Sequence, residues 1–341
     1  MHLGVILAVA AAVSIGLIIV LKPWLARYAV ARPNARSSHK IPTPQGGGIA
    51  VVLATFAGVL LALALAVLEG PSLREVWPLA AAALLLAVVG AVDDIRTIAI
   101  APRLALQFLA VMILVASLPV DLQAVPWVPW WLERAGLVLA GMYFVNIVNF
   151  MDGIDWMSVA EVVPLAGAVV LLGAFAGLSP AAVAVATALA GGMLGFAPFN
   201  RPVARLFLGD VGSLPIGLIL FWLMLQLALH GHLVAALLLP LYYLADATAT
   251  LVRRLLNGEN ITQAHRTHFY QRALGKGWSV LRVVGRVFGL NLWLAVLAAV
   301  TIIRPTLPVA IASLVLAVLA VIGVLQRFAR QAPRKAIDAR L

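Results

Sequence analysis

The chain has 341 residues, of which 64% are hydrophobic and only 11% are charged, with no cysteine and a formal net charge of +11. A soluble domain is about 45–50% apolar and about 25% charged, so this composition excludes the soluble enzyme folds, and the lack of cysteine excludes thiol catalysis and cysteine–metal sites. On an apolar chain the positive charge indicates membrane topology and anionic lipid headgroups rather than nucleic acid.

The apolar residues form stretches long enough to cross a bilayer, which takes about 17–25 residues each. The first stretch has no basic segment before it and runs to about Leu21, which favours a spanning helix over a cleavable signal peptide. The sequence therefore predicts an all-α, polytopic integral membrane protein forming one multi-span domain over residues 1–341. About eleven spanning helices are expected, at 3–21, 46–68, 76–92, 104–120, 135–150, 157–177, 181–198, 212–229, 233–252, 283–303 and 307–326.

The basic residues predict the orientation of these spans. With the N-terminus outside, only Arg74, Arg134 and Arg304 fall on the outer side, and the other 21 of the 24 lysines and arginines fall inside. Such a bias indicates an outer N-terminus and a cytoplasmic C-terminus. Tryptophans at 127, 130 and 131 fit an outer interfacial belt.

The polar motifs gather on the predicted inner face. The loops expected to carry chemistry are 22–48, 93–103, 149–156, 199–213 and 253–282. Carboxylates with amide oxygens suit Mg²⁺ that also binds phosphate, and arginine and histidine in the late loop can neutralise phosphate oxygens. This inventory indicates phosphoryl transfer, which depends mostly on positioning and charge stabilisation. The inference depends mainly on five carboxylates in three of these loops, namely Asp93, Asp94, Asp152, Asp155 and Asp210.

Five motifs follow one another over residues 37–272. They are a Pro-Thr-Pro…Gly-Gly loop, an Asp-Asp pair, Asn-x-x-Asn-x-x-Asp-Gly-x-Asp, Phe-x-Gly-Asp-x-Gly-Ser and a late His-Arg-x-His loop. In this order they resemble the polyprenyl-phosphate N-acetylhexosamine-1-phosphate transferases of glycosyltransferase family 4. That family includes the peptidoglycan translocase and the transferases that initiate O-antigen and other surface glycans. The resemblance implies transfer of N-acetylhexosamine 1-phosphate from a UDP-sugar to undecaprenyl phosphate, with release of UMP.

The resemblance also implies a role for individual residues. Asp210 and Asn149 are the expected metal ligands, for Mg²⁺ or alternatively Mn²⁺. The expected substrate-binding residues are His39, Thr43, Asp155, Phe207 and Arg266. Among them, Asp155 is expected to contact uracil and Phe207 to stack near it. The expected catalytic residues are Asp93, Asp94, Asp152, His265 and His268. Among them, the pair Asp93 and Asp94 is expected to handle the lipid phosphate.

The same resemblance sets the expected surroundings. The partners are UDP-N-acetylhexosamine, undecaprenyl phosphate and membrane lipids, with no nucleic acid, and a homodimer is consistent with the family. The expected location is the bacterial inner (cytoplasmic) membrane, with the active site facing the cytoplasm.

Some positions depart from the family pattern or leave two interpretations open. The family usually has glycine after the last aspartate of Asp-Gly-x-Asp, whereas this chain has Trp156, which we expect to reshape the sugar-nucleotide pocket. The late loop has two histidines instead of three, which favours the initiating branch of the family. Glu161 and Asp246 lie within predicted spans, and each is either a helix-packing hydrogen-bond partner or an active-site group.

Two other classes of function remain open from the residues. A transporter also has polar groups and broken spans, but it predicts midplane sites and an inverted repeat, and no repeat is apparent here. Another membrane phosphotransferase would use a different nucleotide donor, and the CDP-alcohol enzymes carry an aspartate-rich signature on one helix that this chain lacks. Metal-dependent UMP release distinguishes the three classes.

Overall fold

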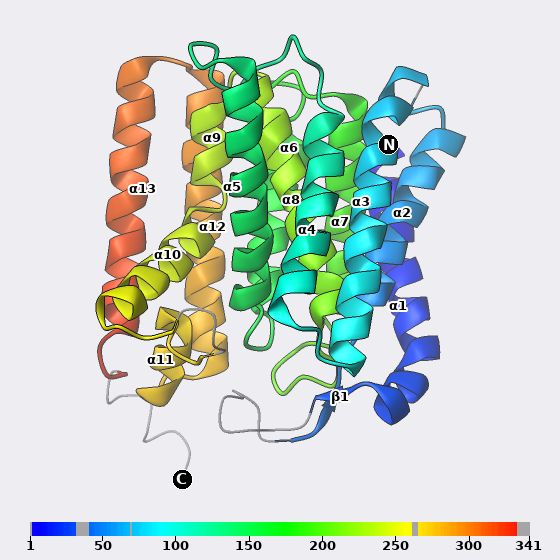
Figure 1. Cartoon of the computed structure of the whole chain (residues 1–341), viewed down its shortest axis with the longest axis vertical. Coiled ribbons are helices and arrows are strands. Elements are labelled where there is room, and N and C mark those ends of the chain that lie inside the picture. Colours follow the sequence, from blue (N-terminus) through cyan, green and yellow to red (C-terminus); the bar gives the residue numbers. More distant parts are fainter. Residues whose placement is uncertain (1, 32–40, 69, 261–264, 333–341) are drawn as a thin grey trace.

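A computed structural model describes residues 2–31, 41–68, 70–260 and 265–332, and this part of the chain is almost entirely helical (Figure 1). The helices are α1 (His2–Tyr28), α2 (Gly48–Ala64), α3 (Gly70–Ile95), α4 (Ile100–Ala116), α5 (Trp130–Met151), α6 (Met157–Leu172), α7 (Pro180–Phe196), α8 (Asp210–Leu229), α9 (Leu233–Leu238), α10 (Leu241–Leu256), α11 (Phe269–Gly275), α12 (Val280–Ile303) and α13 (Leu307–Phe328). Two short antiparallel strands, β1 (Val30–Ala31) and β2 (Thr43–Pro44), pair with each other.

Most of these helices are apolar enough to lie in a membrane. Six are also long enough to cross it by themselves: α1, α3, α5, α8, α12 and α13. The shorter apolar helices are α2, α4, α6 and α7. The prediction of an all-α, polytopic membrane protein is therefore confirmed.

One predicted span is not a single helix. The stretch 233–252 consists of α9 and α10, which are separated at Leu239 and Pro240. Proline has no backbone N–H to donate and its ring clashes with the preceding turn, which explains the break. In Figure 1, α10 runs obliquely away from α9 towards the lower part of α13. Leu255 and Leu256 at its end are exposed, whereas Asp246 and Thr250 are buried.

Several other helices extend beyond their predicted limits. α1 continues to Tyr28 and α3 to Ile95, so the loops expected at 22–48 and 93–103 both begin inside helices. Asp93 and Asp94 consequently belong to the last turn of α3, where the helix fixes their directions.

α8 is the centre of the bundle. All its residues from Val211 to Leu229 are buried, and it packs against α2, α3, α5 and α9. On another side of the bundle, α7 approaches α1 very closely, since a Cβ on Gly191 or Gly195 would lie 2.4 Å from a carbonyl oxygen of α1. Small residues permit such close packing between membrane helices.

The segments that carry the motifs meet at one end of the bundle, the lower end in Figure 1. The strands, the end of α3, the loop before α8 and α11 all lie there. Backbone hydrogen bonds connect the strand segment to the loop before α8, from Phe207 N to Pro44 O (2.9 Å) and from Gly47 N to Phe207 O (2.9 Å). α1 begins at the opposite end and α13 finishes at this one, as an odd number of crossings requires (Figure 1).

Candidate active site

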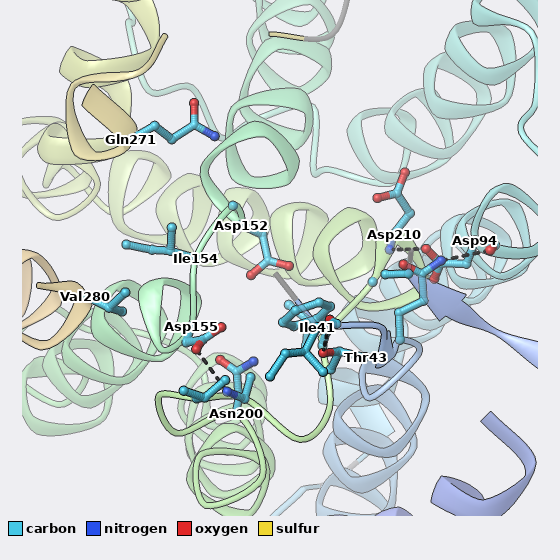
Figure 2. Close-up of a pocket in the computed structure, with 18 of the residues that line it drawn as sticks. Ile41, Thr43, Asp94, Asp152, Ile154, Asp155, Asn200, Asp210, Gln271 and Val280 are labelled. Atoms are coloured by element: carbon cyan, nitrogen blue, oxygen red, sulfur yellow. Dashed lines mark hydrogen bonds between the residues drawn. The ribbon is translucent and has the colours of Figure 1, made fainter. Parts of the chain in front are cut away.

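A cavity of about 560 Å³ opens at this end of the bundle, between the strand segment, the loop before α8 and the turn after α5. Figure 2 shows Asp94 and Asp210 on one side of it, Asp155 and Asn200 on the other, and Asp152 between the two sides. Of the residues predicted from the sequence, those that line the cavity are Thr43, Asp94, Asn149, Asp152, Asp155, Phe207 and Asp210.

Asp210 is the first residue of α8 and is held from a neighbouring helix. The Nδ2 of Asn149, near the end of α5, donates to Asp210 Oδ1 (2.8 Å) and to Ser213 Oγ (2.8 Å). Gly209, which precedes Asp210, has a φ of +77°, a backbone conformation that favours glycine. The two predicted metal ligands are thus in direct contact at the start of a helix, where the helix dipole favours negative groups such as phosphate.

Asp94 caps the same helix from α3. Its two carboxylate oxygens accept from the backbone N–H groups of Asp210 (3.0 Å) and Val211 (3.1 Å). The first N–H groups of a helix have no partner within it, so Asp94 provides one for two of them. Asp94 therefore positions Asp210, although the two residues are 116 positions apart in the chain.

Asp93 does not line the cavity and binds an arginine. Its Oδ1 accepts from Ile98 N (2.6 Å), and its Oδ2 lies 3.0 Å from Nη1 of Arg103. The same Nη1 is 3.7 Å from Asp210 Oδ2. Sequence reasoning missed Arg103 as a site residue, although it stands in the predicted loop 93–103 with the positive charge that phosphate requires.

Asp152 ends α5 and lies between the two sides of the cavity (Figure 2). Ser158 Oγ donates to its Oδ1 (2.5 Å). Burial, reinforced by the nearby charges of Asp210, Asp94 and Asp155, raises the pKa of Asp152 to about 8. A carboxyl with this pKa can hold or release a proton near neutral pH, as general acid–base catalysis requires.

The opposite side of the cavity is built from the loop between α7 and α8. Asp155 Oδ2 accepts from Ala204 N (3.0 Å), and Asn200 Nδ2 donates to Leu206 O (3.0 Å). Asn200, Ala204 and Phe207 all line the cavity. Sequence reasoning missed Asn200, whose only signal is a polar side chain directly after the apolar stretch 181–198.

The late histidine loop lies beside the cavity but does not line it. His268 is buried, with its Nδ1 3.4 Å from Asp246 Oδ1, and Arg266 is exposed. Gln271 and Leu274 of α11 do line the cavity. His39 lies outside the described residues.

Asp246 fixes the position of that loop. Its carboxylate accepts from the backbone N–H groups of Phe269 (2.9 Å) and Tyr270 (3.2 Å) at the start of α11, and from Tyr242 Oη (3.1 Å). The structure therefore favours a packing role for Asp246, which anchors α11 to α10.

Glu161 also has a packing contact. Asn291 Nδ2 donates to Glu161 Oε2 (2.6 Å) and to Ala160 O (2.9 Å). Both side chains are buried, and neither lines the cavity. This pair fastens α6 to α12, which favours the helix-packing interpretation here too.

The donor set fits a metal ion that is shared with a substrate. No group of three histidine, cysteine, aspartate or glutamate side chains able to hold a metal occurs among the described residues. Mg²⁺, however, commonly binds one or two protein ligands and takes its other ligands from substrate phosphates and water. Asp210 and the adjoining Asn149 provide such a partial set.

The sequence of this chain is similar to those of known proteins. Residues 76–228 match the family model described as glycosyl transferase family 4. The chain is 30% identical over 308 residues to the phospho-N-acetylmuramoyl-pentapeptide-transferase of Synechococcus sp. (strain RCC307), covering 80% of this chain and 81% of that protein.

Two further relatives carry a different sugar in their names. The chain is 25% identical over 315 residues to the probable undecaprenyl-phosphate N-acetylglucosaminyl 1-phosphate transferase of Bacillus subtilis (strain 168), covering 84% of each protein. It is 29% identical over 310 residues to the decaprenyl-phosphate N-acetylglucosaminephosphotransferase of Mycobacterium leprae (strain TN), covering 79% of this chain and 75% of that protein.

Proposed function

The chain belongs to glycosyl transferase family 4, and from that membership we propose that it transfers an N-acetylhexosamine 1-phosphate from a UDP-sugar to undecaprenyl phosphate. The products are UMP and a lipid-linked diphospho-sugar that starts a surface glycan such as O-antigen. The observation that carries the proposal is that Asn149, Asp152, Asp155 and Asp210 line the same cavity. UDP-N-acetylglucosamine is the first donor to test, because two of the three relatives described above are named for N-acetylglucosamine.

The cavity suits a sugar nucleotide in size and in the distribution of its polar groups. Its volume of about 560 Å³ falls within the range of small-molecule sites. We assign the side formed by Asp155, Asn200 and Phe207 to the nucleotide base. The side formed by Asp210 at the start of α8, with Arg103 beside it, is assigned to the diphosphate.

We propose Asp210 and Asn149 as the residues that hold Mg²⁺, with Mn²⁺ as an alternative. The ion, when bound, neutralises the negative charge of the diphosphate. Asp94 keeps Asp210 in place through its two hydrogen bonds to the start of α8. Arg103, between Asp93 and Asp210, adds a fixed positive charge at the same position.

In the proposed reaction an oxygen of the lipid phosphate attacks the β-phosphorus of the donor directly. A new P–O bond forms there, the bond to the bridging oxygen breaks, and its electrons leave with UMP. Asp152 accepts the proton of the lipid phosphate when that group reacts as its monoanion. The alternative is a covalent enzyme intermediate on an aspartate. Asp93 and Asp94 are disfavoured as the nucleophile of that alternative, because both oxygens of each carboxylate already accept hydrogen bonds.

The protein is a multi-pass membrane protein, and we propose that it resides in the bacterial inner membrane with the cavity facing the cytoplasm. The distribution of lysine and arginine supports this orientation, since 21 of the 24 fall on the side of the motifs.

The proposal is tested by UMP release from purified protein with undecaprenyl phosphate, Mg²⁺ and a panel of UDP-N-acetyl sugars. We expect release with one sugar and its loss when EDTA is added. Release from a CDP-linked donor instead would place the chain among other phosphotransferases. Folded protein that releases no nucleotide from any donor would contradict the proposed activity.

The metal assignment has its own test in Asp210→Asn. The variant keeps the shape of the side chain and the bond from Asn149 but removes the negative charge, so we expect UMP release to fall by about 10³-fold with little change in thermal unfolding. Asp121→Asn, at an exposed position of the opposite loop, is the matched control and should keep full activity. Normal turnover in Asp210→Asn would remove the metal assignment.

A further inference from the structure

Arg103 is an ion-pair partner of one of the proposed metal ligands. It lies in the first turn of α4, and its Nη1 is 3.0 Å from Asp93 Oδ2 and 3.7 Å from Asp210 Oδ2. The shorter contact is a hydrogen bond, whereas the longer one is too long for a hydrogen bond. Arg103 is therefore fastened to Asp93 and acts on Asp210 through its charge.

The oxygen of Asp210 that faces Arg103 is also the one available to a metal ion. Asp210 Oδ1 accepts from Asn149 Nδ2 (2.8 Å), while Oδ2 lies 3.7 Å from the guanidinium, and the side chain of Asp210 remains 28% exposed. Asp210 lines the cavity, and Arg103 does not. Arg103 therefore influences what the cavity binds through Asp210 and through its charge.

That charge compensates the negative groups around Asp210. Asp93 and Asp94 are close enough for their charges to act on Asp210, and Arg103 lies within ion-pair distance of both Asp93 and Asp210. A fixed cation at this place repels a divalent ion that approaches Asp210 and attracts a diphosphate. One residue thus has opposite effects on the two ligands that the cavity is proposed to bind.

We propose that Arg103 sets the order in which these two ligands bind. It weakens the binding of Mg²⁺ alone and strengthens the binding of the diphosphate alone, so the diphosphate binds first or carries the metal ion with it. Arg103 is a positioning residue in this role, since it acts through Asp210. The inference rests on the proposed function, because it takes Asp210 as a metal ligand and this side of the cavity as the diphosphate site.

The experiment measures the two binding constants separately. Mn²⁺ binding to the purified protein is followed by electron paramagnetic resonance without nucleotide, and UDP binding is followed by titration calorimetry in EDTA. Arg103→Gln removes the charge but keeps an N–H donor for Asp93. We expect the dissociation constant of Mn²⁺ to fall about tenfold and that of UDP to rise about tenfold, the size expected for one unit charge in a partly screened site.

Asp93→Asn makes the opposite change of charge at the same place. Asparagine keeps an acceptor for Ile98 N but leaves Arg103 less neutralised, so we expect Mn²⁺ to bind about fivefold more weakly and UDP about fivefold more tightly. Arg96→Gln is the matched control for the loss of one positive charge. Arg96 is exposed in the loop between α3 and α4 and does not line the cavity, so both dissociation constants should stay within about twofold of the wild-type values.

The signs of the changes decide the outcome, because a merely distorted site would bind both ligands more weakly. Changes of the same sign in Arg103→Gln, or no change, overturn the inference, and Asp93→Asn decides by its own signs if Arg103→Gln does not fold. Wild-type protein that binds Mn²⁺ as tightly without UDP as with it also overturns the inference. If that protein still releases UMP from a UDP-sugar, the proposed function stands. If the changes have opposite signs but no donor is turned over, the proposed transfer fails and the inference stands.

Discussion

His265, in the loop before α11, is a histidine that stays neutral at physiological pH. Burial, reinforced by the neighbouring His268 and Arg254, lowers the pKa of His265 to about 4. The backbone N–H of Thr267 can only donate, and it points at Nδ1 of His265 (3.4 Å). The proton of the neutral ring therefore lies on Nε2, which leaves an uncharged donor.

This state predicts how substitutions of His265 behave. His265→Gln keeps an uncharged N–H donor, so we expect UMP release within about threefold of the wild-type rate. His265→Ala removes the donor, and we expect a loss of about tenfold. The two variants are compared at pH 7.5 at saturating and at limiting donor. A larger loss in the glutamine variant than in the alanine variant would contradict a donor role.

The lowered pKa of His265 also predicts a change of stability with pH. An unfolded chain protonates this histidine near its ordinary pKa of about 6.5, whereas the folded protein resists protonation down to about 4. Above pH 6.5 His265 is neutral in both states and does not reduce the free energy of unfolding. As the pH falls from 6.5 towards 4, only the unfolded chain binds the proton, so the free energy of unfolding decreases. We expect the thermal unfolding temperature to drop more between pH 7 and pH 5 in the wild type than in His265→Gln. Equal decreases of the unfolding temperature in the two proteins would rule out a contribution from the protonation of His265.

Single residues also show where sequence reasoning stops. The motif aspartates could be recognised, but nothing in the chain indicates that Asp94 caps a helix 116 residues later while Asp93 binds an arginine. Asn200 and Arg103 belong to no repeated pattern, and an isolated polar residue in a loop resembles any other. Their roles depend on which loops meet, and only the fold determines that.

At the scale of helices, the site depends on a close approach between α3 and α8. A Cβ added at Gly90 would lie 2.2 Å from the carbonyl oxygen of Asp210. Gly90→Ala must therefore displace the start of α8 together with Asp210, and we expect UMP release to fall by about 100-fold, since small misplacements at a reacting centre are costly. Gly289→Ala is the control, because nothing lies within 4 Å of its added Cβ. Equal activity of the two variants would show that α8 tolerates the shift.

The helices themselves could largely be predicted from hydropathy, but the break between α9 and α10 could not. Proline is common in membrane helices, and Pro23, Pro78, Pro164 and Pro215 all lie inside helices of this protein. Pro240 resembles them in sequence. What distinguishes it is tertiary: the helix after it must turn away so that Asp246 can bind the start of α11.

At the scale of the whole molecule, the orientation in the membrane decides which compartment supplies the substrate. α1 begins at the end opposite the cavity, and α13 finishes at the same end as the cavity (Figure 1). If the basic residues mark the cytoplasmic side, the loop after α4 faces outward and the loop after α7 faces inward. The chain contains no cysteine, so a single introduced cysteine reports its own position without background labelling.

We therefore expect Asp121→Cys and Arg201→Cys to react differently with a membrane-impermeant maleimide in intact bacterial cells. Both positions are exposed, one in each loop, so accessibility to solvent does not distinguish them. Asp121→Cys should be labelled in intact cells, and Arg201→Cys only after the membrane is permeabilised. The cysteine-free chain is the control for non-specific reaction. The reverse pattern would turn the cavity outward, away from the cytoplasmic nucleotide donor that the proposed reaction requires, and would contradict the orientation derived from the charge distribution.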